Sequence, residues 1–227
     1  MIPLNIIPWD LSVIPSRFFL FSEAAWYTLQ ITTLAVLFGL VAGLIVALGR
    51  LSSNKILSSL SRAYIFLIRG TPLLVQLFIV YYGLTSIVTI DPIPSAVIAL
   101  GVHNAAYIAE IFRGSIQSIH YGQMEAARSL GMSKGKAMWR IILPQAFKRA
   151  VPSLGNQLII ALKDSSLAST IAVPELMLRG RQMGSSTFMY MEMFIIVGLW
   201  YLVMTSILSY SMRAIEKKLQ VSDRDNN

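Results

Sequence analysis

The chain has 227 residues, of which 55% are hydrophobic and only 13% are charged, and its mean hydropathy of +0.63 is too high for an ordinary soluble protein. It contains no cysteine and only two histidines, which excludes disulfides and thiolate metal sites and argues against a structural metal. The net charge of +8 comes from basic residues clustered in loops beside apolar segments, which is typical of a membrane protein and not of a nucleic-acid-binding one. We therefore predict a one-domain, all-α membrane protein without nucleic acid or metal as a partner.

The first 22 residues are expected to form a short interfacial segment and not a cleaved signal peptide. A signal peptide carries early positive charge and an unbroken apolar stretch. Here no Lys or Arg precedes Arg17, and prolines interrupt the apolar residues at Pro3, Pro8 and Pro15. Four aromatic side chains suit the headgroup boundary of a bilayer, namely Trp9, Phe18, Phe19 and Phe21. The alternative is a disordered terminus.

A transmembrane domain is predicted over residues 23–213, with a cytoplasmic tail at 214–227. Five apolar segments are near the roughly 20 residues that a helix needs to cross a bilayer. They cover about residues 24–48, 56–90, 95–112, 151–173 and 188–209. In the first, Gly39, Gly43 and Ala47 recur every four residues, so another helix can pack closely on that face.

The second span contains a bend signal, Arg69-Gly70-Thr71-Pro72. Glycine and proline would bend the chain at this string. With the membrane-crossing part taken as Thr71–Ile90, the string lies at the cytoplasmic end. Arg69 is then expected to extend its charge to the lipid headgroups.

The distribution of Lys and Arg predicts that the N-terminus lies outside and the C-terminus in the cytoplasm. A five-span chain places most of them on one side: Arg50, Lys55, Arg62, Arg69, Arg113, Arg128, Lys134, Lys136, Arg140, Lys148, Arg149, Arg213, Lys217, Lys218 and Arg224. The remaining basic residues are Arg17, Lys163, Arg179 and Arg181. By the positive-inside rule, the long polar segment at residues 113–150 is cytoplasmic.

The most polar long stretch is EAARSLGMSKGKAMWRIILP, which runs from Glu125 to Pro144. Its first four residues, Glu125, Ala126, Ala127 and Arg128, are good helix formers, and Gly131 is a natural helix stop. Two alanines beside one carboxylate make a short helix that another surface can approach closely. We predict that these five residues form a docking element. The alternative is an ordinary basic loop that is partly helical.

The sequence contains no phosphate-binding loop. Such a loop needs G-x-x-x-x-G-K-[ST] after a strand. The nearest string, from Gly131 to Ala137, has one residue too few between its glycines and lacks the hydroxyl after the lysine. The chain is therefore expected not to be an enzyme, and any driving energy must come from another subunit.

Several polar residues lie inside the predicted spans, where they are costly unless they face protein or water. They are His103, Asn104 and Tyr107 in the third span and Asn156, Gln157, Lys163 and Asp164 in the fourth. Positions seven apart share a helical face, so Asn156 lies in line with Lys163, and Gln157 in line with Asp164. An anion, a cation and amides in one cavity would suit a zwitterionic solute. We predict a substrate pathway here; the alternative is that these groups pair across helices and only fix packing.

The pattern EAA-x3-G-x9-I-x-LP resembles the signature of the integral-membrane permease subunits of binding-protein-dependent ABC importers. Three further strings resemble the polar amino-acid branch, which includes histidine, glutamine, arginine and cystine systems: RGTPLLVQLFIVYYGL from Arg69, NAAYIAEIFRG from Asn104 and LKDSSLASTIAVPEL from Leu162. The resemblance implies a type I importer fold with five transmembrane helices in the cytoplasmic (inner) membrane, surrounded by lipid. The segment from Glu125 to Gly131 would be the coupling helix that seats on an ATP-binding subunit.

The resemblance also implies a second permease subunit, an extracytoplasmic amino-acid-binding protein, and ATP-Mg held by the ATPase with no cofactor in this chain. Only Asp164 is both acidic and deep, which favours a neutral or zwitterionic polar L-amino acid. The DPIPSA string from Asp91 to Ala96 and the VPEL string are most similar to cystine-type permeases, with the glutamine type next. A self-contained channel or secondary carrier is the alternative, and it would not need Glu125–Pro144. The sequence leaves open whether the two permease subunits are identical or different. It also leaves open whether the binding protein is free or tethered.

Overall fold

The computed structural model describes residues 9–224, and every regular element in this range is a helix. The all-α class predicted from the sequence is therefore confirmed. In chain order the helices are α1 (Val13–Arg17), α2 (Ser22–Arg50), α3 (Lys55–Arg69), α4 (Leu73–Phe78), α5 (Pro92–Gln117), α6 (Tyr121–Ser129), α7 (Lys134–Ala137), α8 (Leu143–Asp164), α9 (Leu176–Thr187) and α10 (Tyr190–Arg224). Tighter 3₁₀ turns cover Phe18–Phe21 and Ser165–Ile171, and wider π-helical turns cover Ile79–Gly83 and Met138–Ile142.

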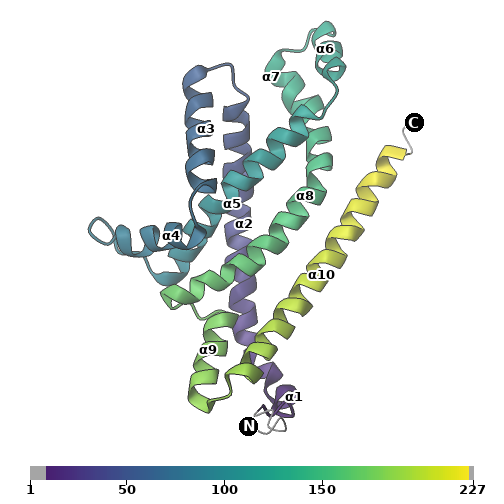
Figure 1. Ribbon diagram of the computed structural model, residues 1–227. Coiled ribbons are helices and arrows are strands. Elements are labelled where there is room, and N and C mark those ends of the chain that lie inside the picture. The colour runs from purple at the N-terminus through teal and green to yellow at the C-terminus, as the bar shows by residue number, and fades with distance from the viewer. Residues whose placement is uncertain (1–8, 225–227) are drawn as a thin grey trace, which may run out of the picture.

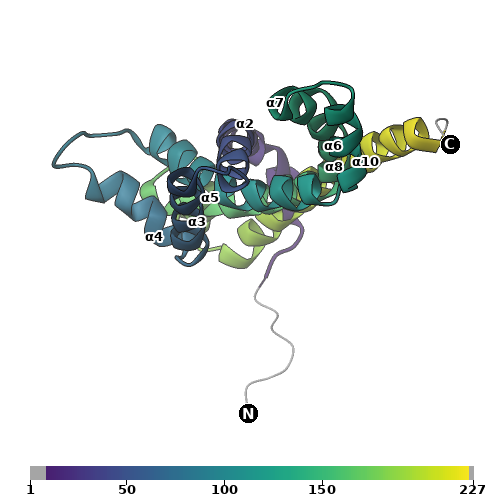
Figure 2. The ribbon, with the colours of Figure 1, turned by 90° about the horizontal axis from the view of Figure 1, so that it is seen from above.

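The long helices α2, α5, α8 and α10 run between two ends of the molecule (Figure 1). One end carries α6, α7, the connection between α2 and α3, and the last turns of α10, whereas the other end carries α1 and α9. Seen from above, α4 and α10 lie on opposite sides, with α2, α5 and α8 between them (Figure 2). The basic segments that were predicted to face the cytoplasm therefore gather at one end.

Three segments of the described chain are long and apolar enough to cross a membrane: Val13–Arg50, Pro92–Gln117 and Tyr190–Leu219. A fourth candidate is the pair Lys55–Arg69 and Leu73–Gly83, whose two parts are bent by 103°. The predicted span at 151–173 corresponds to α8 and the 3₁₀ turn after it. Since α8 is not among the segments that are long and apolar enough to count as spans, the count of five spans and the inside–outside orientation remain predictions.

The bend between α3 and α4 lies deeper than the sequence suggested. The helix α3 begins beside the end of α2 and packs back along it, so Arg69 is at its far end. At 1.5 Å per residue, Arg69 lies about 21 Å from Lys55. Arg69 therefore lies at the end of α3 that is remote from the connection with α2, and its position relative to a membrane stays a prediction. Basic residues lower the hydropathy of α3, but its other side chains are mostly apolar. Together with residues 73–83, α3 therefore forms one candidate span that begins at Lys55.

The small residues of α2 let α5 pack closely against it. A Cβ atom added to Gly39 would lie 3.0 Å from Asn104 Cβ, and one added to Gly43 would lie 2.9 Å from the Ala105 carbonyl oxygen. Ala47, on the same face, is fully buried against α5 and its neighbours. The prediction that this face of α2 receives another helix is confirmed, and the other helix is α5.

Replacing Gly43 with alanine is expected to destabilise the protein, because the new methyl group meets backbone that cannot move aside cheaply. Overpacking of this kind costs about 1–3 kcal/mol. Thermal unfolding of the purified protein in detergent measures the loss. Gly114→Ala is the matched control, since no atom lies within 4 Å of its added Cβ and it too is in a helix. Equal unfolding temperatures for the two variants would contradict the packing argument.

The segment before α2 packs against α10 and does not lie free. The Phe18 ring stacks on Trp200 with centroids 4.8 Å apart, and the Phe18 carbonyl accepts a hydrogen bond from the Trp200 indole at 2.9 Å. Phe21 is fully buried in the same cluster. Phe18 and Phe21 therefore pack within the protein, whereas Phe19 and Trp9 are exposed, and the interfacial position of the segment stays a prediction. Residues 1–8 of the predicted interfacial segment lie outside the described residues.

Candidate coupling lobe and transport path

The polar segment between α5 and α8 folds into a small lobe, which we call the coupling lobe and define as residues 118–137. It projects beyond the ends of the long helices (Figure 1). The His120 ring begins α6 by accepting a hydrogen bond from the Gly122 amide at 3.1 Å, and the Ser133 hydroxyl begins α7 by accepting one from Lys136 at 3.3 Å. An apolar cluster fixes the base of the lobe to α5 and α8; it is formed by Ile116, Ile119, Ile142 and Ala146.

Gly131 ends α6 with a left-handed turn. Its φ is +81°, a conformation that glycine adopts without the penalty of a side chain. The Met132 amide donates to the Ala127 carbonyl at 3.1 Å, and the Gly131 amide donates to the Arg128 carbonyl at 3.0 Å. This is the hydrogen-bond pattern of a Schellman cap, which satisfies the last carbonyl groups of a helix. The glycine of the EAA pattern is therefore required by the backbone.

The five predicted coupling residues divide into one that packs inward and four that face outward. Ala127 is only 5% exposed, whereas Glu125, Ala126, Arg128 and Gly131 are exposed. Two apolar side chains are exposed on the same lobe, Leu130 at 85% and Tyr121 at 72%. Sequence reasoning missed both, although Leu130 lies directly before the glycine. The outer surface thus combines small, apolar and charged groups, which suits a protein partner better than water alone.

Two of the predicted pathway residues are paired with each other. The Gln157 amide nitrogen donates to the Asn104 side-chain oxygen at 2.8 Å, and the Asn104 nitrogen donates to the Leu100 carbonyl at 2.8 Å. Both side chains are buried. This pair joins α5 to α8, so the arrangement is the cross-helix packing that was the alternative reading for them. A role for Asn104 and Gln157 in a pathway stays a prediction.

His103 braces the bend between α3 and α4 through Gln76. Its Nδ1 lies 3.1 Å from the Gln76 side-chain oxygen. The Gln76 nitrogen in turn donates to the Ile68 carbonyl at 2.7 Å and to the Thr71 carbonyl and hydroxyl at 3.2 and 2.9 Å. Backbone groups freed by a broken helix must find partners inside the protein when the break lies in a membrane. Gln76 provides them, and the sequence analysis did not single it out.

Tyr107 lies one turn from His103 along α5, and its ring contacts Arg69. The Arg69 guanidinium carbon is 5.0 Å from the centroid of the ring, a cation–π distance. The His103 ring also contacts Tyr107, with centroids 4.9 Å apart. The bend of the second span and the polar face of α5 therefore form one site, which the sequence analysis had divided between two predictions.

The polar residues of α8 separate by face as the spacing predicted. Asn156 and Lys163 are both exposed, whereas Gln157 is buried and Asp164 is partly buried. Lys163 and Asp164 lie in the last turn of α8, roughly 10 Å along the helix from the Asn104–Gln157 pair. The structure thus brings Asn104 of α5 and Gln157 of α8 together, and it leaves Lys163 and Asp164 further along α8.

Near the lobe, Glu110 joins α2 to α5. It accepts from Arg113 at 2.9 Å and from Arg50 at 3.2 Å, so one carboxylate is shared by two guanidinium groups. All three side chains are partly exposed, which keeps the expected contribution to stability small. Within the described residues, no group of three or more His, Cys, Asp or Glu side chains is placed to hold a metal ion.

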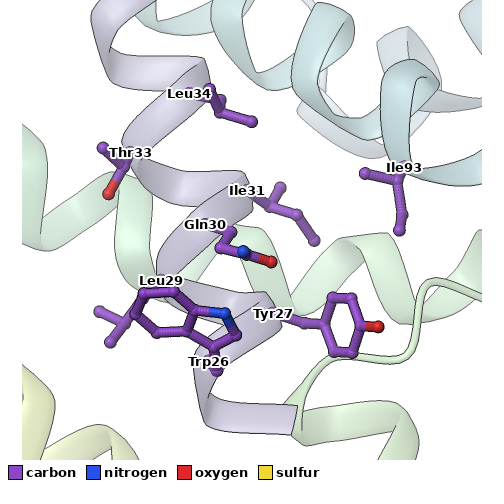
Figure 3. A pocket seen from close by; sticks show the side chains of 8 residues that line it. All are labelled: Trp26, Tyr27, Leu29, Gln30, Ile31, Thr33, Leu34 and Ile93. Atoms are coloured by element: carbon purple, nitrogen blue, oxygen red, sulfur yellow. The ribbon is translucent and has the colours of Figure 1, made fainter. Parts of the chain in front are cut away.

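An open hollow of about 390 Å³ lies on the side of α2, away from these polar residues. In Figure 3, Tyr27, Gln30 and Ile31 of α2 point toward Ile93 at the start of α5. Most of its lining is apolar, and none of the predicted pathway residues contributes to it. The hollow is therefore a surface feature of the single chain, and we do not place the transport path there.

Residues 39–221 match the family described as "Binding-protein-dependent transport system inner membrane component", and the match includes the coupling lobe, both halves of the bend and α8. The chain belongs to this family. As a member, it is a multi-pass inner-membrane component of a transport system, and the resemblance seen in the EAA pattern is confirmed.

Known permeases align with this family member over nearly its whole length. The L-cystine transport system permease protein TcyB of Bacillus subtilis is 41% identical over 94% of this chain and 92% of that protein. The glutamine transport system permease protein GlnP of Escherichia coli K12 is 37% identical over 94% of this chain and 99% of that protein. These relatives confirm the resemblance to the amino-acid branch.

Solved structures give the same result for the fold. A crystal structure described as an amino acid ABC transporter with histidines has a TM-score of 0.85 and 40% identity, covering 92% of this chain and 98% of that chain. The arrangement of helices is therefore that of a permease of this transporter class. The coupling lobe extends beyond the long helices at the end of the molecule that carries the basic segments (Figure 1).

Proposed function

We propose that the chain is the permease subunit of an ABC importer that carries a polar L-amino acid across the cytoplasmic membrane, with cystine as the first candidate and glutamine as the second. The observation that carries this proposal is the 41% identity to an L-cystine permease over 94% of the chain. The sequence strings DPIPSA and VPEL favour the same order of candidates. Energy comes from ATP-Mg in a separate ATP-binding subunit, because this chain lacks a phosphate-binding loop.

The coupling lobe is the proposed seat of the ATPase. Glu125, Ala126, Arg128 and Gly131 are exposed there, and Leu130 adds an apolar side chain that a groove can enclose. The apolar cluster at the base ties the lobe to both α5 and α8. A shift of the lobe by the ATPase would therefore move both helices, and ATP binding and hydrolysis would change the populations of inward-open and outward-open states.

The path itself is proposed to form between this chain and a second permease subunit, either a second copy or a paralogue. Asn156 and Lys163 are exposed on a helix that lies within the membrane domain, and polar groups at such positions require protein or water beside them. Lys163 and the neighbouring Asp164 supply opposite charges, so together they suit the carboxylate and ammonium groups of a zwitterion. An extracytoplasmic binding protein would deliver the amino acid to the end that carries α1 and α9.

Uptake by the reconstituted complex tests the proposal. The permease, its ATPase and its binding protein are incorporated into proteoliposomes, and labelled cystine uptake is measured with and without internal ATP. We expect ATP-dependent uptake that unlabelled cystine competes away more strongly than glutamine or arginine. Competition by glutamine alone would favour the second candidate. Uptake by the permease without ATPase or ATP would overturn the proposal in favour of a channel or secondary carrier.

A further inference from the structure

Arg69 is an exposed charge deep within the membrane domain. It ends α3, about 21 Å from the first residue of that helix, which is roughly two thirds of a 30 Å hydrocarbon core. Its side chain is exposed in the single chain. An arginine at such a depth is costly in lipid and is almost always directed toward protein or a water-filled cavity.

The exposed surface of α3 has a basic side and an apolar side. Lys55, Arg62 and Arg69 are seven residues apart and therefore lie on one stripe, and all three are exposed. The apolar side is formed by large exposed side chains, namely Ile56, Leu60 and Leu67. Phe66 is also exposed and lies between Arg62 and Arg69 on the basic stripe, so at that level the stripe presents an aromatic ring beside the charges. The stripe leads from the coupling-lobe end of the molecule to the bend.

Within the described residues Arg69 forms no direct ion pair, although the Glu110 carboxylate attracts its charge from beyond ion-pair distance. The ring of Tyr107 supports the guanidinium at 5.0 Å, and the ion pairs of the described chain leave Arg69 out. The nearby carboxylate of Glu110 is shared by Arg50 and Arg113. The planar guanidinium is therefore available to an anion, and its fork of N–H donors matches a carboxylate.

We propose that Arg69 faces the aqueous transport path, on the cytoplasmic side of the Asn104–Gln157 pair, and binds the α-carboxylate of the amino acid after it leaves Lys163 and Asp164. The inference rests on the proposed function. Tyr107 lies further along α5 toward the lobe than the Asn104–Gln157 pair, so Arg69 is on the cytoplasmic side of that pair. Arg62 and Lys55 continue the positive potential toward the exit. Every α-amino acid has this carboxylate, so Arg69 contributes affinity for the class and not selection among side chains.

Cysteine chemistry tests the proposal, because the chain has no cysteine of its own. The variant Arg69→Cys is assembled with the ATPase in inverted membrane vesicles and treated with charged methanethiosulfonate reagents from the cytoplasmic face. We expect uptake by the untreated variant, measured in proteoliposomes, to fall at least tenfold. The ethylammonium reagent puts a positive charge back at this position and should raise the uptake of the variant several-fold. The ethylsulfonate reagent adds a negative charge and should not raise it. Saturating amino acid should slow the labelling.

Leu67→Cys is the matched control, since Leu67 is on the same helix, two residues away, and is 60% exposed on the apolar side. Its thiol should remain unlabelled and its uptake should stay near that of the unaltered complex. Failure of Arg69→Cys to react, uptake that is unaffected by the change, or equal rescue by both reagents would each overturn the inference. So would a loss confined to vesicles with anionic lipid, which would assign Arg69 to headgroups. Failure of the unaltered complex to transport any amino acid would instead overturn the proposed function.

Discussion

Replacing Gly131 with arginine is expected to release the ATP-binding subunit while the transmembrane helices stay folded. The residue has φ = +81° and closes the cap of α6, so any bulky side chain there opposes the backbone turn that presents the lobe. The penalty for a side chain in this conformation is about 1–2 kcal/mol, which corresponds to a roughly tenfold weaker binding constant for the ATP-binding subunit. The bulk of the arginine side chain adds to this loss. Co-purification of the ATPase with the tagged permease measures the loss, and ATP-dependent uptake should fall with it.

Gly131→Asn is the control for this experiment, because asparagine tolerates the left-handed conformation better than other residues with a side chain. No atom lies within 4 Å of an added Cβ at Gly131, so neither variant clashes within the chain. The asparagine variant should retain most of the ATPase. Charge is tested separately by Glu125→Lys, which is expected to weaken assembly through an exposed position. If both Gly131→Arg and Glu125→Lys assemble and couple normally, the lobe is not the site of docking.

Changing Asp164 to asparagine is expected to abolish uptake without affecting assembly. The carboxylate is partly buried in the last turn of α8, beside the exposed Lys163, and the proposed path uses it to hold the ammonium group of the amino acid. Hydrogen bonds to charged groups contribute about 1.5–3 kcal/mol, so the expected loss is roughly ten- to one-hundredfold. Uptake in proteoliposomes and ATPase co-purification are measured on the same preparation.

Glu23→Gln provides the comparison for Asp164→Asn, since it removes an exposed carboxylate from the first turn of α2 with the same change of charge. Its uptake should be unchanged. A complex that falls apart on Asp164→Asn would show that the carboxylate holds the fold together and does not act on the solute. Full uptake by Asp164→Asn would remove Asp164 from the path.

The coupling lobe could be predicted from the sequence because its information is local. Helix formers from Glu125 to Arg128, followed by a glycine at the capping position, specify a short helix and its end without reference to the rest of the chain. The small-residue face of α2 was predictable for a similar reason, since Gly39 and Gly43 leave room that only another helix can fill. Which helix fills it could not be read from the spacing, because that depends on the connection between distant segments.

The bend and its surroundings were predicted only in part. The string from Gly70 to Pro72 indicated a break, and a helical approach from about residue 56 was expected. The depth of the break depends on where the span begins, and the charges of Lys55 and Arg62 favoured a membrane-crossing part that starts only at Thr71. Gln76 was missed because its importance comes from the Ile68 and Thr71 carbonyls, which it reaches back to across the break, and from His103 on α5. The pairing of Asn104 with Gln157 likewise depends on the contact between α5 and α8. From the sequence, such pairing across helices was only the alternative to a substrate pathway.

The amide of Gln76 also bears on how the transporter changes shape. From α4 it reaches back to the Ile68 carbonyl at the end of α3 and to Thr71 within the break, and the Thr71 hydroxyl donates to the Leu67 carbonyl. These backbone groups therefore keep their hydrogen bonds whether the space beside the bend is wet or dry. Because Gln76 also meets His103 at 3.1 Å, a movement of the bend would have to carry α5 with it or break that contact.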